Sequence, residues 1–534
     1  MGEWWRGAVV YQIYPRSFCD SNGDGVGDLA GISSKLEYVA DLGVDAIWVS
    51  PFFKSPMKDF GYDVEDFRQV DPVFGDLDDF DALVSKAHSL GLKLVIDQVY
   101  SHSSDQCDWF KESRQSHSNN KAGWYTWANA KEDGSPPNNW QSAFGGPAWT
   151  WDDTRQQYYL HNFLPEQPDL NLHNPEVRKE LLDIARFWLD RGVDGFRLDA
   201  TNHFMHDPSL KDNPDEPVSL EANSDETPVV LYNASHPDTV GFLKEVRAVL
   251  NQYPGRFSVA EVGGPNSLRD IRQFTQGSDR LDTGYSFVFL DLKKLSAQDI
   301  GKAVRYWDEF ETVWPSWTFN NHDGPRVVSR WGNGFEPVQL AKTLQTLLLM
   351  LRGTLFMYQG EELGLPQANI PFEKLKDPEA IANWPDTMGR DGARTPMPWS
   401  GRDNNGGWPD NAWMPLDEAH FAMNAERQMK SSNSTLAYCR RLLQFRKQHP
   451  ALLEGSIEFI ESPQDMLVFT RSNEKENILC VFNLGKDEQH FSANIPGADI
   501  SGNWLFGFGG ASRNRPALIP PLGGYLTKFK TAIP

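Results

Sequence analysis

Short apolar stretches typical of buried strands alternate with amphipathic helical stretches along most of the chain, from about residue 9 to residue 449. A strand followed by a helix and another strand predicts parallel strands joined by helical crossovers. Eight such units predict an α/β protein with a (β/α)8 TIM barrel, whose functional groups gather at the carboxyl ends of the strands. The strands are expected at 9–15, 46–51, 92–99, 195–200, 257–262, 286–289, 317–323 and 354–358, and the helices include 29–43, 77–91, 238–253, 296–313, 337–353 and 436–449.

Two stretches depart from this alternation. Residues 102–174 are rich in Trp, Asn, Gly and Pro with few periodic segments, so we expect a functional excursion from the barrel. After residue 450, short alternating strands with Gly turns predict an antiparallel β domain. The expected division is barrel at 1–101, inserted domain at 102–174, barrel again at 175–450 with insertions at about 205–237 and 366–433, and a C-terminal β domain at 451–534.

The charge balance argues against one class of partner. The chain has 534 residues and a formal net charge of −22, whereas nucleic-acid binding needs clustered Lys and Arg. The sequence contains neither an apolar run of about 18 residues nor a charged-then-apolar leader, so we expect no membrane partner. Its 4 cysteines are scattered without metal-like spacing, which is typical of free thiols in a reducing compartment. We therefore expect a cytoplasmic enzyme, with its oligomeric state left open.

The fourth expected strand is the most informative one. It reads Gly-Phe-Arg-Leu-Asp-Ala at 195–200. Alternation along a strand places Arg197 and Asp199 on one face and the apolar Phe196 and Leu198 on the other. If the apolar pair packs outward, a cation and a carboxylate remain in the barrel, which costs several kcal/mol per ion unless their geometry is good. On this stretch alone, an ion pair that merely ties strand to loop is an equal alternative.

Three other strand ends favour a functional interpretation. They carry Asp97 with His102, then Glu261, then His322 with Asp323. In a barrel of parallel strands these side chains would converge at one mouth. Carboxylates that share a concave site repel one another, so at least one should keep its proton near neutral pH.

We expect the carboxyls to differ in protonation. Arg197 should keep Asp199 ionised, whereas the apolar neighbours of Glu261 should raise its pKa. Glycoside hydrolysis requires such a pair, with one carboxylate as nucleophile and one carboxylic acid as proton donor. A Zn²⁺ or Mg²⁺ site is the alternative, but Arg197 would repel a divalent cation and no His-x-His or His-x-x-x-His spacing occurs among these residues.

A separate loop predicts a bound cation. Residues 20–28 place oxygen side chains at alternate positions with a Gly at the sixth, as in the first half of a calcium loop. Gly31 stands where such a loop would have its Glu, so a turn that caps the next helix is the alternative. We expect a structural Ca²⁺, with Mg²⁺ possible, held by Asp20, Asn22, Asp24, the Val26 carbonyl and Asp28.

Four motifs follow one another in a recognisable order: Asp-Gln-Val-Tyr-Ser-His at 97–102, Gly-Phe-Arg-Leu-Asp-Ala-Thr-Asn-His at 195–203, Ala-Glu at 260–261, and Asn-Asn-His-Asp at 320–323. They resemble the motif set of the α-amylase family, glycoside hydrolase family 13. Gln-Pro-Asp-Leu-Asn at 167–171 resembles the signature of its oligo-1,6-glucosidase and α-glucosidase branch. Gly-Tyr-Asp at 61–63 and Arg-Asp-Gly-Ala-Arg at 390–394 are similar to further family motifs, and the likeness runs from residue 4 to about 450.

The resemblance implies roles for individual residues. Asp199 would be the nucleophile, Glu261 the acid/base and Asp323 the transition-state stabiliser. The glucosyl ring at the cleavage subsite would be bound by Tyr62, Asp63, His102, Arg197, His203, His322 and Arg394. Ser101 stands where α-amylases have a calcium-binding Asn, which argues against their interdomain calcium and leaves the loop at 20–28.

The resemblance also implies an activity. It is that of an exo-acting, retaining α-glucosidase, which releases glucose from short α-1,4-linked glucosides such as maltose or sucrose and transfers glucose through a covalent glucosyl-enzyme. An isomaltase, a sugar isomerase and a glucosyltransferase on the same framework are the alternatives. A non-catalytic relative, like the transporter-associated heavy chains, is disfavoured because all three carboxylates are present.

Two finer expectations concern specificity. Ala200 follows the expected nucleophile, as in α-1,4-preferring members that it resembles, whereas α-1,6-preferring members have Val there. Arg394 is expected to pair with Asp63 across the pocket floor, with Arg390 as the competing partner. A pocket closed in this way would admit one glucose beyond the cleaved bond, so cleavage would start at the chain end.

Overall fold

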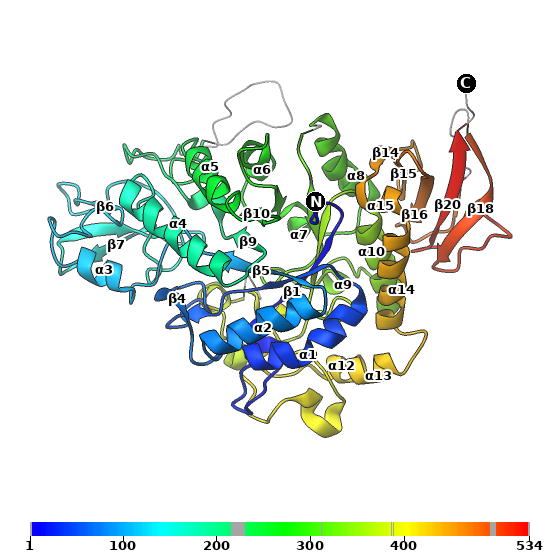
Figure 1. The fold of residues 1–534 in the computed structure, drawn as a ribbon, viewed down its shortest axis with the longest axis horizontal. Helices are drawn as coiled ribbons and strands as arrows, with labels where there is room; N and C mark the ends of the chain where they lie inside the picture. Colours follow the sequence, from blue (N-terminus) through cyan, green and yellow to red (C-terminus); the bar gives the residue numbers. More distant parts are fainter. Residues whose placement is uncertain are drawn as a thin grey trace.

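The centre of the fold is a sheet of eight parallel strands that curls into a nearly closed barrel, in the order β11-β10-β9-β5-β2-β1-β13-β12 (Figure 1). The computed structural model describes residues 3–214, 230–310, 312–385, 387, 389–491 and 498–531, so part of the insertion expected at 205–237, and two residues of the one at 366–433, lie outside the described residues. The predicted (β/α)8 fold is confirmed. Its strands are β1 (Val9–Ile13), β2 (Ala46–Val49), β5 (Lys93–Gln98), β9 (Gly195–Leu198), β10 (Phe257–Val262), β11 (Thr283–Ser286), β12 (Ser316–Thr318) and β13 (Thr354–Tyr358).

The fourth barrel strand, β9, is pressed closely against its neighbour. Gly195 pairs with Phe257 of β10, and a Cβ atom at Gly195 would lie 2.6 Å from the Phe257 carbonyl oxygen. Glycine is therefore required where the two strands meet. Every residue of β9 is buried, and Arg197 is 0% exposed. The strand thus carries a fully buried cation into the barrel, as the alternation of its side chains predicts.

Long helices cover the outside of the barrel, and their ends carry the expected capping signals. Asp28 caps α1 by accepting a hydrogen bond from the Gly31 amide, and Gly43 ends that helix with φ +94°. Asp76 and Asp79 form a capping box on α2. These helices are α1 (Leu29–Leu42), α2 (Leu77–Ser89), α4 (Pro175–Asp190), α5 (Thr239–Leu250), α6 (Ser267–Thr275), α8 (Ala297–Arg305), α10 (Pro337–Met350) and α14 (Thr435–Gln448).

The prediction for the sixth strand was wrong. The strand is β11, which ends at Ser286, and the apolar residues after it form the short helix α7 (Val288–Asp291), which buries Phe289. The weakly apolar β11 is the strand because Gly284 lets it lie against α6: a Cβ atom there would be 3.1 Å from Ile271. The helix expected at 296–313 is also shorter, because a 3-10 turn follows α8 from Tyr306.

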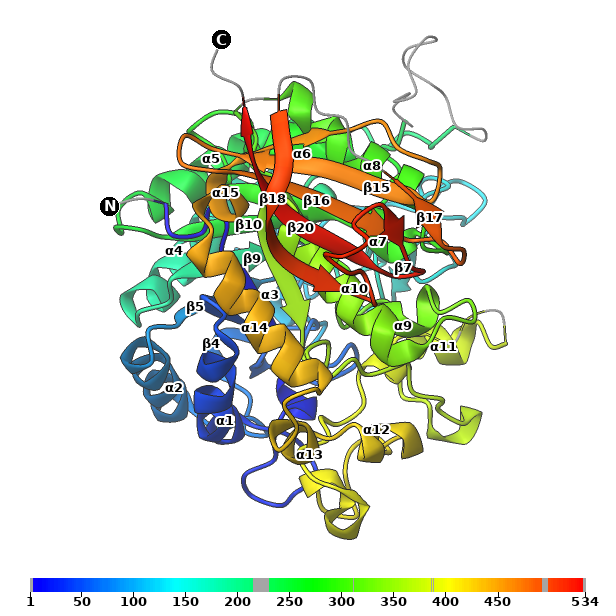
Figure 2. The same cartoon turned by 90° about the vertical axis from the view of Figure 1, so that its right-hand side faces the viewer.

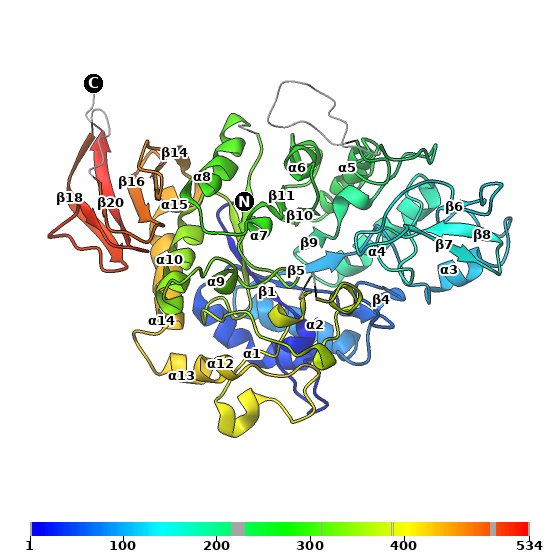
Figure 3. The same ribbon diagram turned by 180° about the vertical axis from the view of Figure 1, so that it is seen from behind.

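The inserted segment and the C-terminal sheet lie at opposite ends of the molecule (Figures 1 and 3). Within residues 102–174 the chain forms the helix α3 (Asp108–Ser113) and a three-stranded antiparallel sheet in the order β6-β8-β7. His102 forms an isolated bridge with Asp169, so both ends of the segment return to the barrel together. The strands of this sheet are β6 (Trp127–Ala128), β7 (Trp149–Asp152) and β8 (Gln157–Leu160), and the short β3 (Phe53–Lys54) and β4 (Asp66–Val70) form a separate pair after β2.

The C-terminal region is an antiparallel sheet in the order β14-β15-β16-β20-β18, which Figure 2 shows facing the viewer. Buried side chains of this sheet, such as Phe469 and Leu526, belong to the same apolar core as the barrel helices. The sheet therefore packs onto the barrel instead of standing apart. Its strands are β14 (Ser456–Phe459), β15 (Met466–Ser472), β16 (Asn477–Asn483), β18 (Ala498–Phe508) and β20 (Gly524–Thr531), with the small pair β17 (Gln489–His490) and β19 (Leu518–Ile519) beside them.

Short helices occupy the loops that follow the last barrel strands. None of the helices in the described part of the chain is both long and apolar enough to cross a membrane. The short helices are α9 (Val327–Arg330), α11 (Pro378–Ala382), α12 (Glu418–Ala422), α13 (Ala425–Met429) and α15 (Pro450–Glu454).

Candidate active site

A cavity of about 720 Å³ opens at the carboxyl ends of the barrel strands. Asp199 follows β9, Glu261 is the penultimate residue of β10, and Asp323 lies in the loop after β12. The structure therefore brings together the three carboxyl groups that the sequence placed at strand ends. Other residues that line the cavity are Asp59, Tyr62, His102, Phe144, Phe163, Gln167, Ala200, His203, Phe287, Glu379 and Arg390.

One guanidinium group is shared by three carboxyl groups. Arg197 Nη1 donates to Asp97 Oδ1 at 2.5 Å and to Asp199 Oδ1 at 2.6 Å. The other terminal nitrogen, Nη2, forms an ion pair with Glu261 Oε1. Trp48 donates its indole N–H to the second oxygen of Asp97 at 2.8 Å, so that carboxyl is held from both sides. These contacts form a buried ion-pair network. The pairing offsets the free energy that it costs to bury the Arg197 guanidinium.

This sharing decides the protonation of the network. Burial raises the pKa of Glu261 to about 8, with Arg197 opposing the rise and Asp199 adding to it. Burial likewise raises the pKa of Asp199 to about 7, because Arg197 is divided among three acids and Asp97 repels the added charge. The expectation that Arg197 keeps Asp199 ionised was therefore wrong near neutral pH. The raised pKa expected for Glu261 agrees with its buried position.

Asp323 stands in the opposite environment. Its Oδ1 accepts a hydrogen bond from Arg394 Nη2 at 2.9 Å and lies 3.7 Å from Arg390 Nη1, while its Oδ2 is 3.2 Å from His322 Nε2. Burial on its own would raise the pKa of Asp323, but His322, Arg394 and Arg390 hold it at about 2. The most firmly ionised carboxyl of the site is therefore Asp323, whereas the sequence pointed to Asp199.

The histidines of the site are neutral hydrogen-bonding groups. Burial lowers the pKa of His102 to about 3 and that of His203 to about 4, and it holds the pKa of His322 well below its usual value. His322 lies between Gln12 and Tyr62: its Nδ1 is 2.8 Å from Gln12 Nε2 and its Nε2 is 2.7 Å from the Tyr62 hydroxyl. These rings can therefore orient hydroxyl groups without adding charge.

The expected pair of Asp63 with Arg394 does not form. Asp63 is 0% exposed, and its carboxylate accepts hydrogen bonds from the Lys58 and Asp59 amides and from the Ser55 hydroxyl. These bonds shape the loop after β2 and hold the Asp63 carboxylate within that loop.

The acid of that loop that lines the cavity is Asp59, four residues earlier. Its Oδ1 accepts from Arg390 Nη2 at 2.8 Å. Arg390, which was the competing candidate, is itself anchored by Asp377 at 2.8 Å. The ion pair between the loop after β2 and the loop after β13 is therefore Asp59 with Arg390. Arg394 is instead hydrogen-bonded to Asp323.

Ala200 adopts an unusual backbone conformation beside the acids. Its φ is +42°, and its amide donates to Glu261 Oε2 at 3.0 Å. A positive φ is rare for residues with a side chain and is least tolerated by β-branched ones. The backbone here is held by the carboxyl that it contacts, so Ala200 connects the two acids as well as lining the cavity.

The loop at 20–28 keeps the turns of a cation loop, but its acids do not converge. Asp20 accepts from the Asn22, Gly23 and Gly25 amides, and Asp24 accepts from the Val26 amide. Asp28 uses both oxygens to bind Ser21 and to cap α1. Within the described residues no group of three or more His, Cys, Asp or Glu side chains is arranged to hold a metal ion. The fit of the loop to Ca²⁺ is thus partial, and a bound cation stays a prediction.

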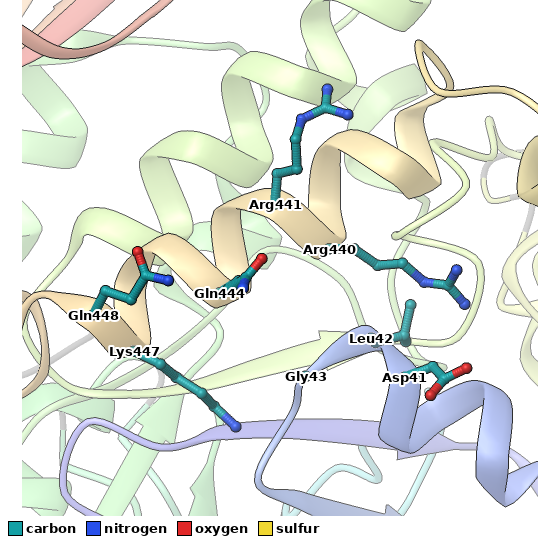
Figure 4. Close-up of a pocket in the computed structure, with 8 residues that line it drawn as sticks. All are labelled: Asp41, Leu42, Gly43, Arg440, Arg441, Gln444, Lys447 and Gln448. Carbon is teal, nitrogen blue, oxygen red and sulfur yellow. The ribbon is translucent and has the colours of Figure 1, made fainter.

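Two further hollows differ in their relation to the site. One, of about 460 Å³, adjoins the cavity and shares His203, Asn202 and Gly263 with it. The other, of about 390 Å³, is the groove between the end of α1 and α14 that Figure 4 shows. It shares no residue with the catalytic cavity, and its Lys447 is paired with Asp45 at 2.8 Å.

Several site residues were missed from the sequence. Asp59 stands in the same short stretch as Asp63, and the strand-end signal had already marked Asp97 without giving it a role. Phe144, Phe163 and Phe287 line the cavity from loops in which nothing but their aromatic type could have marked them. Gln167 belonged to a recognised motif, yet its place in the cavity depends on how the inserted segment folds back.

Comparison with known proteins points to one family. Residues 12–455 match the family model described as alpha amylase, catalytic domain. The chain is 49% identical to a probable alpha-glucosidase of Rhizobium meliloti over 91% of its length and 90% of that protein, and 38% identical to an oligo-1,6-glucosidase of Heyndrickxia coagulans over 92% and 94%. Among solved structures it is similar to the alpha-glucosyl transfer enzyme XgtA (TM-score 0.92, 46% identity, 99% of this chain and 100% of that one). It is also similar to the trehalulose synthase MutB of Pseudomonas mesoacidophila (TM-score 0.91, 32% identity, 99% and 100%).

Proposed function

The chain belongs to the α-amylase family of glycoside hydrolases, and on that premise we propose that it is an exo-acting, retaining α-glucosidase of short α-1,4-linked glucosides. The observation that carries the proposal is the sharing of Arg197 by Asp199 and Glu261. Two carboxyls held on one guanidinium are close neighbours, as the nucleophile and acid of retaining enzymes must be, at about 5–5.5 Å. Burial raises the pKa of both carboxyls, and the family resemblance gives Asp199 the role of nucleophile and Glu261 that of acid/base in this proposal.

The proposed reaction has two displacements. In the first, an oxygen of Asp199 bonds to the anomeric carbon while the bond to the leaving oxygen breaks, and Glu261 gives its proton to that oxygen. In the second, Glu261 takes a proton from water, whose oxygen bonds to the anomeric carbon as the ester to Asp199 breaks. An alcohol in place of water would give transfer with the same bonds made and broken. Asp323, held at a pKa of about 2, is a permanent negative charge for the cationic sugar ring that develops between them.

The Asp59–Arg390 pair supports action at the chain end. It lies on the cavity wall and joins two loops. In this proposal the pair bounds the space beyond the terminal glucose. Charge-assisted contacts of this kind position a sugar ring and also exclude a further one. We propose that the substrate is a small oligosaccharide or glucoside and that its glucosyl ring contacts Tyr62, His102, His322 and this pair.

Glucosyl transfer is the second candidate function. XgtA is described as an alpha-glucosyl transfer enzyme and MutB as a trehalulose synthase, so proteins with this fold include an enzyme of glucosyl transfer. The hollow that adjoins the cavity supports the idea, because amide side chains such as Asn202 and Asn233 could bind the hydroxyls of an acceptor sugar.

The products formed from maltose and from end-labelled maltotetraose test these proposals. We expect α-glucose as the first product from maltose, and glucose as the first product from the non-reducing end of maltotetraose. A β-anomer would overturn the two-step mechanism, and maltose as the primary product would overturn the closed pocket. Growing trisaccharides in the maltose reaction would indicate transfer.

A further inference from the structure

Gln167 is a fully buried amide at the point where the inserted segment returns to the barrel. Its exposed fraction is 0%, and it stands two residues before Asp169, the bridge partner of His102. A buried side-chain amide must find partners for its oxygen and both N–H groups, because leaving one unpaired costs about 1–3 kcal/mol. The partners of Gln167 therefore show what the side chain is built to hold.

The orientation of the amide is set by its own turn. The backbone N–H of Leu164 donates to the side-chain oxygen Oε1 of Gln167 at 3.1 Å. The backbone N–H of Gln167 donates back to the Leu164 carbonyl at 2.8 Å. Since Oε1 accepts from a backbone N–H, the other end of the side chain must be the nitrogen. Both N–H groups of Nε2 then point away from the turn and toward the cavity, which Gln167 lines.

Nε2 reaches two side chains of the proposed glucosyl pocket. It donates to Asp59 Oδ2 at 3.2 Å, on the oxygen that Arg390 does not bind. It also lies 3.0 Å from His102 Nε2, and Ser101 Oγ lies 2.9 Å from the other ring nitrogen. One amide from the inserted segment thus touches groups that follow two different barrel strands.

The contact also bears on which nitrogen of His102 carries the proton. Gln167 can donate to Nε2 only when the ring proton is on Nδ1, where Ser101 Oγ accepts it. The Tyr62 carbonyl oxygen, 3.1 Å from Nε2, favours the opposite tautomer. Gln167 and Tyr62 therefore compete for one nitrogen, and the amide opposes a proton on the side that faces Tyr62.

We propose that Gln167 is a positioning residue for the glucosyl pocket, which holds the Asp59 carboxylate and the His102 ring in place. The proposal rests on the α-glucosidase function proposed above and adds to it a physical link between the inserted segment and the sugar site. Binding of the terminal glucose then depends on the seating of the segment, although the residue acts only through Asp59 and His102.

Two substitutions separate positioning from simple packing. Gln167→Leu removes both N–H donors, so KM for maltose should rise about tenfold or more at every pH, with a smaller change in kcat. Gln167→Glu keeps an oxygen for the Leu164 amide but turns the second oxygen toward Asp59. The ratio of its KM to that of the unchanged protein should increase from pH 5 to pH 8. The introduced carboxyl ionises over this range and places a negative charge where an N–H donor faced Asp59.

Gln428→Glu is the matched control. Gln428 is also buried, accepts from the Leu436 amide at 3.0 Å and donates to the Leu363 carbonyl at 2.9 Å, but it does not line the cavity. It should lower the melting temperature without raising KM. If Gln167→Glu behaves like this control, or if both Gln167 variants keep the KM of the unchanged protein while folded, the positioning role is wrong.

A direct binding measurement keeps this test independent of the proposed activity. Calorimetry with an iminosugar analogue of glucose should show affinity lost in the Gln167 variants and retained in Gln428→Glu. Absence of hydrolysis by the unchanged protein would contradict the α-glucosidase proposal alone. Equal affinity of the Gln167→Glu variant and the unchanged protein for the iminosugar would contradict the positioning role alone.

Discussion

The two charged clusters at the barrel mouth balance their charges in opposite ways. Around Arg197 one cation serves the three acids Asp97, Asp199 and Glu261. Around Asp323 one acid lies beside two cations, Arg394 and Arg390, and the neutral ring of His322. Because a carboxyl keeps its proton where negative charge is in excess, the first cluster titrates near neutral pH, and the second stays ionised.

The difference separates two catalytic needs. Proton transfer requires a group whose pKa lies near the working pH, and Glu261, at about 8, meets that condition. Stabilisation of a cationic transition state requires a charge that does not titrate, and Asp323, at about 2, provides it. A carboxyl group can meet either need, because its pKa depends on how many arginines lie beside it and how many other acids share them.

The largest expected effect comes from removing Asp199, the proposed nucleophile, from the first cluster. Asp199→Asn should lower kcat for maltose by at least about 10³-fold, since the covalent step is lost. Folding should be retained, because the pKa of Asp199 is higher in the folded protein, near 7, than in the unfolded chain. Such an acid lowers the free energy of unfolding as pH rises from its unfolded pKa toward its folded pKa. The melting temperature of the variant should therefore not fall below that of the unchanged protein at pH 7. Activity near normal would show that Asp199 is not the nucleophile.

The second cluster is tested by the arginine that serves it. Arg394→Ala should lower kcat/KM by about 10²-fold or more, because the pKa of Asp323 rises once its 2.9 Å partner is gone. Removing a buried partner should also cost about 3–5 kcal/mol of stability.

Arg390→Ala is the contrasting variant. This substitution removes the partner of Asp59 and should mainly raise KM. Asp377→Asn is its control, because it weakens the hydrogen bond that anchors Arg390 and leaves Arg390 itself in place. If Arg390→Ala lowers kcat more than Arg394→Ala does, the roles assigned to the two arginines are reversed.

Ala200 tests whether the first cluster also influences linkage preference. Ala200→Val should shift the ratio of maltose to isomaltose hydrolysis toward isomaltose by about tenfold, which is the scale of a methyl-sized change in a pocket. The variant should also lose about 1–2 kcal/mol of stability, because Val tolerates a φ of +42° poorly.

Ala200→Gly is the control for this strain. It relieves the backbone without narrowing the cavity, so it should leave the preference for maltose intact. Faster hydrolysis of isomaltose than of maltose by the unchanged protein would contradict the linkage prediction from the outset.

Removing one acid from the first cluster should shift its titration. In Asp97→Asn the pKa of Asp199 should fall by about one unit, because Asp97 no longer repels the charge on Asp199. The acidic limb of the pH profile of kcat/KM should move to lower pH by that amount. An unmoved limb would mean that Arg197 is not effectively shared. Each profile is normalised to its own maximum before the variant and the unchanged protein are compared, so a general loss of activity does not affect the result.

The smallest expected effect concerns the acids at 20–28, which have no arginine among their contacts in the described structure. If a cation balances them, chelation should lower the melting temperature by a few degrees and leave activity at room temperature unchanged, since none of these residues lines the cavity. Asp24→Asn should reproduce the effect in part. Unchanged melting after exhaustive chelation would leave the loop as a set of turns.

Much of the fold could be predicted because its signals are local. The strand β10 was predicted with its observed bounds, and α2 and α10 begin where their capping residues indicate. The prediction of the sixth strand was wrong because it relied on the local signal alone. Apolar character suggested 286–289, whereas packing against Ile271 favoured the glycine-containing stretch before it. Periodicity reports what a segment can bury, and it does not report which neighbour is available.

The candidate site was predictable to the extent that strand ends determine it. Asp199 and Glu261 were identified because parallel strands in a barrel bring their carboxyl ends together, whatever the loops do. Loop residues lack such a rule. Asp63 and Asp59 stand four positions apart in one loop, and only the hydrogen bonds of that loop turn Asp63 inward and leave Asp59 facing the cavity.

The sequence by itself determined the eight strand-and-helix units and the acids at their ends, because alternation along a strand and the stripe along a helix are properties of neighbouring residues. The tertiary structure alone decided which arginine reaches which acid. Arg390 meets Asp59 across 331 positions of chain, and Arg394, one 3-10 turn later, meets Asp323 instead. Long side chains on loops have many rotamers, so their partners are selected by the packed surroundings and by the desolvation of each charge.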